Sequence, residues 1–291
     1  MTRWTRRSLM RAIWATTGLL MTACASTPDY KPQRGQMGKD VMWLPTSERL
    51  AEKMLQMAAA GPQDLLVDLG AGDGVIPIHA AKTRGLRAVG IEYNPKLAEH
   101  ARQNVRRAGL TERVNIITGD IFVEDFSQAS VVTMYLLPEL NQQLRPTLQA
   151  MKPGTRIVSN SFDMGDWEAD ASHEEGRESA YLWIVPAAVA GVWQLSMPER
   201  RWHMTLQLRQ RHQQVGGSLN LEGVSQPVLG AHLRGADLRF TFIGPDEGTY
   251  SVQARVQGAS LQGSVISYGQ SQPVSGLRLD APAQGVRSAA P

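Results

Sequence analysis

Apolar residues recur along this chain with two different periods, and the change of period near residue 190 divides the 291 residues into two regions. In the first region, short apolar runs typical of buried strands alternate with stretches whose apolar residues lie three or four positions apart, as on one face of a helix. The expected strands are 65–67, 87–91, 114–118, 130–135 and 156–159, and the expected helices are 47–60, 75–82, 96–108 and 139–151. This alternation predicts an α/β fold with a doubly wound parallel sheet and helices on both faces.

The second region, residues 191–291, has a period of two. Apolar and polar residues alternate in 202–208, and the pattern returns at 219–221, 238–242 and 252–256 with glycine-containing turns between these runs. Short strands at such spacing predict a small antiparallel all-β domain, either a meander or a small barrel. It contains no grouping of catalytic residue types, so we expect it to pack against other parts of the protein or to bind a partner.

Residues 1–24 predict a signal peptide of the lipoprotein type. Four arginines within the first eleven residues precede an apolar stretch, 12–21, that is too short to span a bilayer as a helix. Small residues follow, and Met21-Thr22-Ala23-Cys24 resembles a lipobox, in which the cysteine of a bacterial lipoprotein receives its lipid. Residues 25–39, rich in proline and polar groups, are expected to form a linker.

This leader predicts a lipoprotein in the bacterial periplasm or at the outer membrane, attached to the membrane through Cys24. Residues 5–11 resemble a twin-arginine export signal, but paired arginines also occur in general secretory signals, so both routes stay open. A chance cysteine in an ordinary signal peptide is one alternative. Another is translation from Met37 or Met42, which would leave a cytoplasmic enzyme.

Charge and cysteine content exclude several classes of function. The formal net charge is +3, and the leader carries several of the basic residues, so the rest of the chain is nearly neutral. It therefore has no overall positive potential that would attract nucleic acid. Cys24 is the only cysteine, which excludes a disulfide framework and a cluster of thiolate ligands. His173-Glu174 lacks a second histidine at helical spacing, so we predict no metal site.

The most informative motif is the glycine turn in Val-Asp-Leu-Gly-Ala-Gly-Asp-Gly, residues 67–74. A dinucleotide fingerprint, G-x-G-x-x-G, would need glycine at position 75, which is Val75. Gly70, Gly72 and Gly74 instead form G-x-G-x-G after Asp68. This pattern resembles the first motif of class I methyltransferases that use S-adenosylmethionine (SAM), and it implies a Rossmann-like methyltransferase domain over residues 40–190.

Acidic residues follow three successive strands at the edge where such sheets bind ligands. Asp68 at the first strand end can reach the amino-acid end of SAM. Glu92, about twenty residues beyond the turn, can accept hydrogen bonds from the ribose hydroxyls. Asp120 follows the third strand and is expected to bind the adenine amino group, with Ile121 or Phe122 packing on the ring. We therefore predict SAM as the cofactor.

The end of the fourth strand is expected to receive the methyl acceptor. Amino methyltransferases of nucleic acids often carry (N/D)-P-P-(Y/F) there, whereas this chain has Met134-Tyr135-Leu136-Leu137. The absence of the motif counts against a base methylase. Tyr135 offers a ring wall or a hydroxyl to the acceptor, although a tyrosine packed in the core is an equal alternative. Methyl transfer depends mainly on positioning, so no strong base is required.

A closer resemblance covers residues 40–190. The residues that carry it are Asp40-Val41 with Pro45-Thr46, the glycine turn, and the stretches 90–95, 135–138 and 162–167. They resemble the protein-lysine methyltransferases that act on subunit c of mitochondrial ATP synthase and on the adenine nucleotide translocase, and their bacterial relatives. By this resemblance Thr46 lies near the SAM carboxylate. The mitochondrial enzymes lack the lipobox and the second region, so their substrates do not carry over.

The segment after the fifth strand is expected to be a strongly acidic loop. Seven carboxylates and one arginine lie between Asp163 and Glu178. Near the acceptor they would attract a cationic target, so the expected acceptor is a protein lysine or a small cationic molecule; a solvated acidic surface is the alternative. Two functions remain open: a SAM-dependent N-methyltransferase, or a non-catalytic lipoprotein that keeps the fold as a ligand-binding or scaffolding module.

Overall fold

The computed structural model describes residues 30–36, 42–176 and 178–279. Residues 1–31 and 32–291 form separate units, and the description that follows concerns the second. The predicted signal peptide with Cys24, and most of the predicted linker, lie outside the described residues, so both stay predictions. No helix of the described part is long and apolar enough to cross a membrane.

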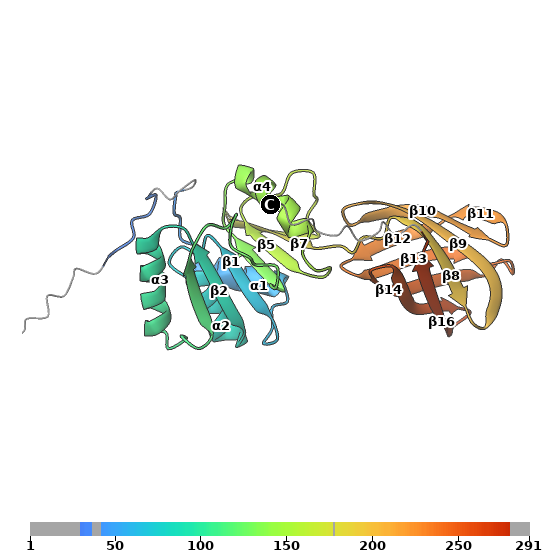
Figure 1. The fold of residues 1–291 in the computed structure, drawn as a ribbon, viewed down its shortest axis with the longest axis horizontal. Helices are drawn as coiled ribbons and strands as arrows, with labels where there is room; N and C mark the ends of the chain where they lie inside the picture. Colours follow the sequence, from blue (N-terminus) through green and yellow to red (C-terminus); the bar gives the residue numbers. More distant parts are fainter. Residues whose placement is uncertain (1–29, 37–41, 177, 280–291) are drawn as a thin grey trace, which may run out of the picture. The chain divides into compact units, whose positions relative to one another are not determined.

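A seven-stranded sheet forms the first half of the chain, with the strand order β3-β2-β1-β4-β5-β7-β6 (Figure 1). Strands β1 to β5 are parallel, β7 is antiparallel to β5, and β6 is antiparallel to β7. The predicted doubly wound α/β fold is confirmed, but its sheet is mixed. The strands are β1 (Leu65–Leu69), β2 (Arg87–Glu92), β3 (Val114–Thr118), β4 (Val131–Met134), β5 (Arg156–Asn160), β6 (Ala171–Glu175) and β7 (Glu178–Ile184).

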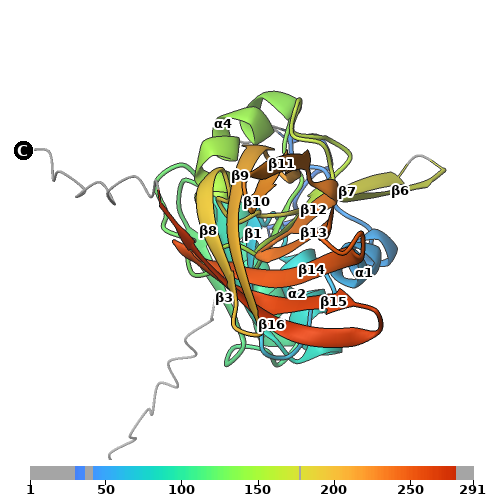
Figure 2. The same cartoon turned by 90° about the vertical axis from the view of Figure 1, so that its right-hand side faces the viewer.

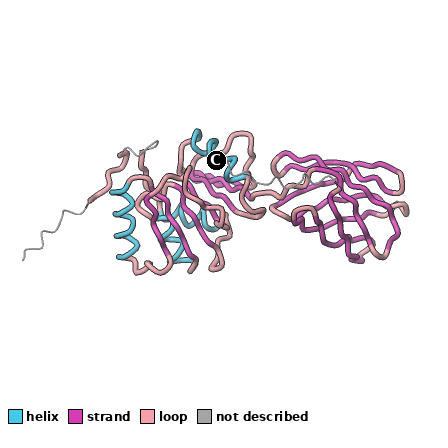
Figure 3. The backbone as a smooth tube through the Cα atoms, viewed as in Figure 1, coloured by secondary structure: helices cyan, strands magenta, loops and turns pink. Residues whose placement is uncertain are grey.

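Helices cover both faces of this sheet. They are α1 (Glu48–Met57), α2 (Val75–Arg84), α3 (Pro95–Arg107) and α4 (Pro138–Gln149). Buried residues of α1, α2 and α3 pack in one core with Leu66 of β1, whereas buried residues of α4 pack in another core with Val67 and Leu69. Because successive strand residues point to opposite faces, β1 supplies both cores. The connections 119–130 and 161–170 contain no helix (Figure 3).

The prediction of an acidic loop after β5 is wrong for the second half of that stretch, which belongs to the β6–β7 hairpin (Figure 2). All residues of β6 are exposed or only partly buried, so the strand has no apolar alternation that a sequence pattern could show. Its position comes from pairing with β7 and from Arg49 on α1, whose guanidinium contacts Glu175 at 2.5 Å and Glu178 at 2.7 Å. This strand therefore forms through contacts with distant residues and not through a local sequence pattern.

A nine-stranded antiparallel sheet forms the second half, in the order β11-β10-β9-β8-β16-β15-β14-β13-β12. The chain passes from one edge strand to the other through Val228, so the sheet curls around its own apolar core. The side-chain amide of Gln226 also binds both backbone groups of Ile243, at 2.8 and 2.9 Å. The predicted all-β region is confirmed, with β8 (Gly191–Met197), β9 (Arg200–Arg211), β10 (Gln214–Leu221), β11 (Val224–Pro227), β12 (Leu229–Arg234), β13 (Asp237–Ile243), β14 (Thr249–Gln257), β15 (Ser260–Ser267) and β16 (Gln270–Arg278).

Candidate active site

The turn between β1 and α2 needs glycine because of both its backbone angles and its neighbours. Gly70 and Gly72 have φ angles of 79° and 57°, in the left-handed region that other residues rarely adopt. A Cβ atom on Gly72 would lie 2.5 Å from Nε1 of Trp43, and one on Gly70 would lie 3.1 Å from the side chain of Leu136. The turn therefore presents bare backbone to the space in front of it.

Glu92 ends β2 beside this turn and fixes its position. Its Oε2 accepts a hydrogen bond from the backbone N–H of Gly72 at 2.9 Å, and its Oε1 accepts one from that of Asn94 at 2.8 Å. The residue is 8 % exposed, and burial raises the pKa of its carboxyl even though these two bonds favour the charged form. Glu92 thus joins the glycine turn to the start of α3.

Asp68 is the most buried carboxyl of the site. It lies on β1 and accepts a hydrogen bond from Oγ1 of Thr133, on the neighbouring strand β4, at 2.7 Å. Burial raises its pKa to about 7, and the charges of Asp73 and Glu92 act in the same direction, although the Thr133 bond opposes them. Burial also raises the pKa of Asp73. Three carboxyl groups are therefore held close together with their charge only partly compensated.

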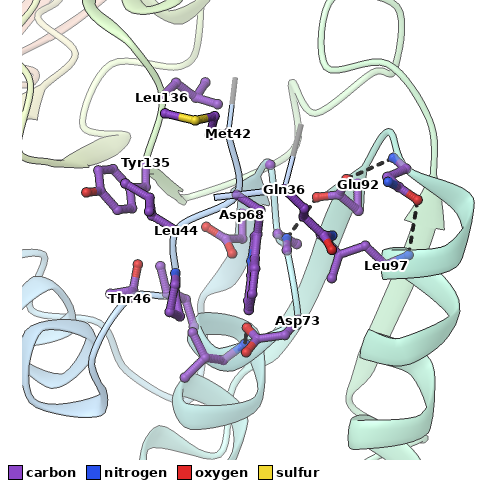
Figure 4. A pocket seen from close by; sticks show the side chains of 18 residues that line it. Gln36, Met42, Leu44, Thr46, Asp68, Asp73, Glu92, Leu97, Tyr135 and Leu136 are labelled. Atoms are coloured by element: carbon purple, nitrogen blue, oxygen red, sulfur yellow. Dashed lines mark hydrogen bonds between the residues drawn. The ribbon is translucent and has the colours of Figure 1, made fainter. Parts of the chain in front are cut away.

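These groups line one cavity at the carboxyl edge of the parallel strands (Figure 4). Asp68 lies between Tyr135 on one side and Glu92 on the other. Among the described residues that line it, none is a lysine or an arginine. The lining consists of Gln36, Met42, Trp43, Leu44, Pro45, Thr46, Asp68, Gly70, Ala71, Gly72, Asp73, Val75, Ile76, Glu92, Asn94, Leu97, Tyr135 and Leu136.

Trp43 narrows this cavity. Its indole lies against the glycine turn, and its backbone is held by two hydrogen bonds of 2.9 Å, to the N–H of Gly35 and to the carbonyl of Gln36. The remaining cavity volume is about 70 Å³, enough for a few water molecules. The indole therefore takes up part of the space in front of the glycine turn.

Tyr135 and Thr46 line the cavity, and a second group of side chains from β5 and the residues after it holds them. The ring of Tyr135 stacks on that of Phe162, with centroids 6.4 Å apart and planes inclined by 30°. Behind them, Nδ2 of Asn160 donates to Oγ1 of Thr46 at 3.4 Å, and Oγ of Ser161 donates to Oδ1 of Asn160 at 2.7 Å. Ser161 itself has a φ of 67°. Thr46 is thereby tied to the end of β5.

Three of the predicted site residues do not line this cavity among the described residues. Gly74 begins α2 in a left-handed conformation, and a Cβ atom there would lie 3.4 Å from that of Ala101. Asp120 accepts a hydrogen bond from the N–H of Phe122 at 3.0 Å, and Ile121 packs against the apolar core under α4. Their predicted contacts with SAM stay predictions.

The acidic residues after β5 have partners within the fold. Asp166 contacts Arg211 and Arg145, whose hydrogen bonds and charge hold the pKa of its carboxyl down at about 2. Asp170 accepts a hydrogen bond from the N–H of Ile184 at 2.7 Å, and Glu168 accepts one from Gln214 at 2.9 Å. Glu175 and Glu178 pair with Arg49. Most carboxylates of this stretch therefore make contacts within the fold.

Several residues of the site were not found from the sequence: Trp43, Asp73, Thr133, Asn160 and Ser161. Asp73 stood inside the motif, next to the glycines, and could have been taken from it. Trp43 lines the cavity, whereas Thr133, Asn160 and Ser161 lie behind it and hold Asp68 and Thr46. These contacts form only when β1, β4, β5 and the segment before α1 come together, and no local spacing indicates that.

Comparisons with known proteins bear on this site. The family model of the ANTKMT methyltransferase domain matches residues 68–171. A protein-lysine N-methyltransferase of Saccharolobus islandicus (strain REY15A) is 38% identical over 151 residues, which are 50% of this chain and 94% of that protein. The lysine N-methyltransferase of Mus musculus that is named for the C subunit of ATP synthase is 30% identical over 174 residues, 58% of this chain and 68% of that protein.

One solved structure is that of an RNA methyltransferase from Salinibacter ruber in complex with S-adenosyl-L-homocysteine, 44% identical and covering 50% of this chain and 96% of that one, with a TM-score of 0.49. The relatives from Saccharolobus islandicus and Mus musculus are each matched over at least two thirds of their length. The matched family domain includes the glycine turn, Glu92 and Tyr135. The chain therefore belongs to the SAM-dependent protein-lysine N-methyltransferases that share the ANTKMT methyltransferase domain.

Proposed function

We propose that this enzyme transfers a methyl group from SAM to the side-chain amine of a protein lysine. The observation that carries the proposal is the cavity, in which Asp68, Asp73 and Glu92 lie with no lysine or arginine among the described lining residues. SAM supplies a methyl group on a positively charged sulfur and also carries an ammonium group. Three carboxylates of the chain suit such a ligand, and the matched relatives are named for lysine methylation.

Each part of the cavity has a proposed role in holding the cofactor. The bare backbone at Gly70 and Gly72 allows close approach, and Gly74 starts the helix behind it. Asp68 faces the ammonium group, and Glu92 faces the ribose hydroxyls. Thr46, tied to Asn160, lies toward the carboxylate of the cofactor. Asp120 and Ile121 are proposed for the adenine end.

Tyr135 and Phe162 are proposed to orient the acceptor. In the reaction the neutral lysine nitrogen forms a bond to the methyl carbon while the carbon–sulfur bond breaks, and the amine loses its proton to water. A stacked aromatic pair can hold the aliphatic part of a lysine side chain and keep water from the reacting atoms. Positioning of this kind is the main aid to such a displacement, since no strong base is needed.

Transfer of tritiated methyl from SAM tests the proposal. The full chain is incubated with a bacterial protein extract, and labelled products are digested with nuclease or protease and hydrolysed. We expect protease-sensitive, nuclease-resistant label that is recovered as methyl-lysine, and we expect Asp68→Asn to lose it while the exposed control Glu174→Gln keeps it. Label that is absent, sensitive to nuclease or on another residue type would contradict the proposal.

The comparisons do not favour the alternative of a non-catalytic scaffold, because the matched relatives are enzymes. The acceptor is proposed to be a protein, although a small cationic acceptor remains a prediction. No nucleic acid is expected to be a substrate, and the partner predicted for the second sheet stays unidentified.

We further propose that Cys24 carries a lipid and attaches the enzyme to a membrane outside the bacterial cytoplasm. The support is the leader sequence, with its arginines, short apolar stretch and lipobox-like residues 21–24. A tagged full chain is followed in bacteria treated with globomycin, which blocks lipoprotein processing. Accumulation of the longer form is expected. Soluble protein that is unaffected by the drug would instead favour translation from Met37 or Met42 in the cytoplasm.

A further inference from the structure

The turn that joins β9 to β10, residues 211–214, contacts the segment 161–170 that follows β5. Gln213 makes the central contact: its Oε1 accepts a hydrogen bond from Nε1 of Trp167 at 3.2 Å, and its Nε2 donates to the carbonyl of Glu168 at 2.7 Å. The oxygen and the nitrogen of one side-chain amide thus bind two consecutive residues. Trp167 is fully buried, so its N–H would lack a partner without Gln213.

The neighbours of Gln213 extend this contact. The imidazole of His212 stacks on the indole of Trp167, with centroids 6.0 Å apart and planes inclined by 26°, and its Nδ1 lies 3.0 Å from Nε2 of Gln149 at the end of α4. Arg211 contacts Asp166 at 3.2 Å. The turn therefore reaches one end of the segment through a hydrogen-bonded amide, a stacked ring and an ion pair.

The β9–β10 turn is itself held in place. Oε1 of Gln210 accepts a hydrogen bond from the N–H of Val189 at 2.7 Å, and its Nε2 donates to the carbonyls of Ala187 and His212, both at 2.8 Å. The connection between the two sheets is thereby fixed to the strand that carries the turn. A rigid turn is what a positioning contact requires.

The other end of segment 161–170 contacts the lining of the cavity at Tyr135. Phe162 stacks on Tyr135, and Nδ2 of the buried Asn141 lies 3.2 Å from the carbonyls of both Phe162 and Asp163. The segment contains no helix that could hold its shape alone. Its first residues therefore contact the cavity lining, whereas residues 166–170 contact the β9–β10 turn in addition to α4 and β7.

We propose that residues 211–214 position segment 161–170 for the methyl acceptor, with Gln213 as the main positioning residue. The proposal rests on the proposed function, because it assigns Phe162 to the acceptor side. It gives the second sheet a part in methyl transfer, which the family match, ending at residue 171, does not cover. The effect is expected on the use of the acceptor and not on the binding of SAM, since Asp68 and Glu92 belong to other strand ends.

Hydrogen exchange and kinetics on the full chain test this assignment. We expect Gln213→Ala to speed amide exchange in residues 161–170 by about tenfold, the effect of losing two hydrogen bonds. We expect kcat/KM for the acceptor to fall by about tenfold or more, while the Kd for SAM changes by less than about twofold. Gln213→Glu keeps the oxygen that faces Trp167 and should lie between the two. Gln253→Ala, an exposed change on β14, should leave all three quantities unaltered.

The readouts separate failure of this assignment from failure of the proposed function. Unchanged exchange in residues 161–170 of Gln213→Ala would overturn the positioning role whether or not a methyl acceptor is known. A parallel loss of SAM affinity would overturn it too, because general damage would then explain the kinetics. If the wild-type chain methylates no lysine but exchange rises as expected, the contact stands and the proposed function fails.

Discussion

The two walls of the catalytic cavity are built in different ways. The wall next to β1 and β2 consists of backbone in left-handed conformations and of carboxylates within β1, in the glycine turn and at the end of β2. Its geometry is therefore local to one strand–turn–helix unit and its neighbour. The wall next to β4 and β5 depends on side chains from distant segments, as in the contact of Thr46 with Asn160 and the stacking of Tyr135 on Phe162. The first wall suits an invariant cofactor. The second can differ between enzymes that use different acceptors.

Gly72→Ala should produce the largest effect on the first wall. The new Cβ would clash with the side chain of Trp43, and the φ of 57° is strained for alanine. The turn would therefore shift into the space that the cofactor needs, and we expect the Kd for SAM to rise by about a hundredfold or more. Isothermal titration calorimetry measures the change. Gly109→Ala is the matched control, because its φ is 68° and no atom lies within 4 Å of its Cβ position. Equal losses of SAM affinity in both variants would refute the special role of the turn.

Asp68→Asn should stabilise the unliganded chain at pH 8 by about 2 kcal/mol, a value discounted from the full pKa shift. Burial raises the pKa of Asp68 from 3.8 to about 7, so between these values the folded chain holds a proton that the unfolded chain has released. Stability of the wild-type chain therefore falls as pH rises through that window, and the amide removes this loss. Urea unfolding at pH 8 and pH 4 measures it, with Glu174→Gln as the control. A variant less stable than wild type at pH 8 would contradict the argument.

The pH dependence of SAM binding should be next in size. Protonation of Asp68 below its pKa of about 7 removes the charge that we propose faces the ammonium group, so lowering the pH from 8 to 6 should raise the Kd by about tenfold. The raised pKa values of Asp73 and Glu92 act in the same direction. Calorimetric titrations across this range measure the effect, and the dependence should become much weaker in Asp68→Asn. A Kd that does not vary with pH would rule out a carboxylate of this pKa as a cofactor ligand.

The smallest effect is expected on the second wall. Tyr135→Phe removes a hydroxyl but keeps the ring that stacks on Phe162, so we expect kcat/KM for the acceptor to fall by about threefold to tenfold, the worth of one hydrogen bond. The Kd for SAM should stay within about twofold, because no cofactor contact changes. Steady-state kinetics with a labelled acceptor protein provide the measurement. A variant that loses SAM affinity would show that the two walls do not act separately.

The difference between the walls also explains how much the sequence reveals. The glycine turn and Glu92 could be predicted because their backbone angles and spacing depend on residues nearby in the chain. Asn160, Ser161 and Trp43 could not, since only the packing of β5 and of the segment before α1 brings Trp43 to the cavity and Asn160 with Ser161 to Thr46. Strand β6 was missed for a related reason: it is exposed on both faces and owes its position to Arg49 and β7.

The central claim is that the carboxylate-lined cavity binds SAM through Asp68. Titration of SAM into the full chain and into Asp68→Asn at pH 8 tests it most directly. The account predicts one-site binding by the wild-type chain and an affinity at least about tenfold weaker in the variant, the cost of losing one charged hydrogen bond. Identical isotherms, or no binding by the wild-type chain, would contradict it.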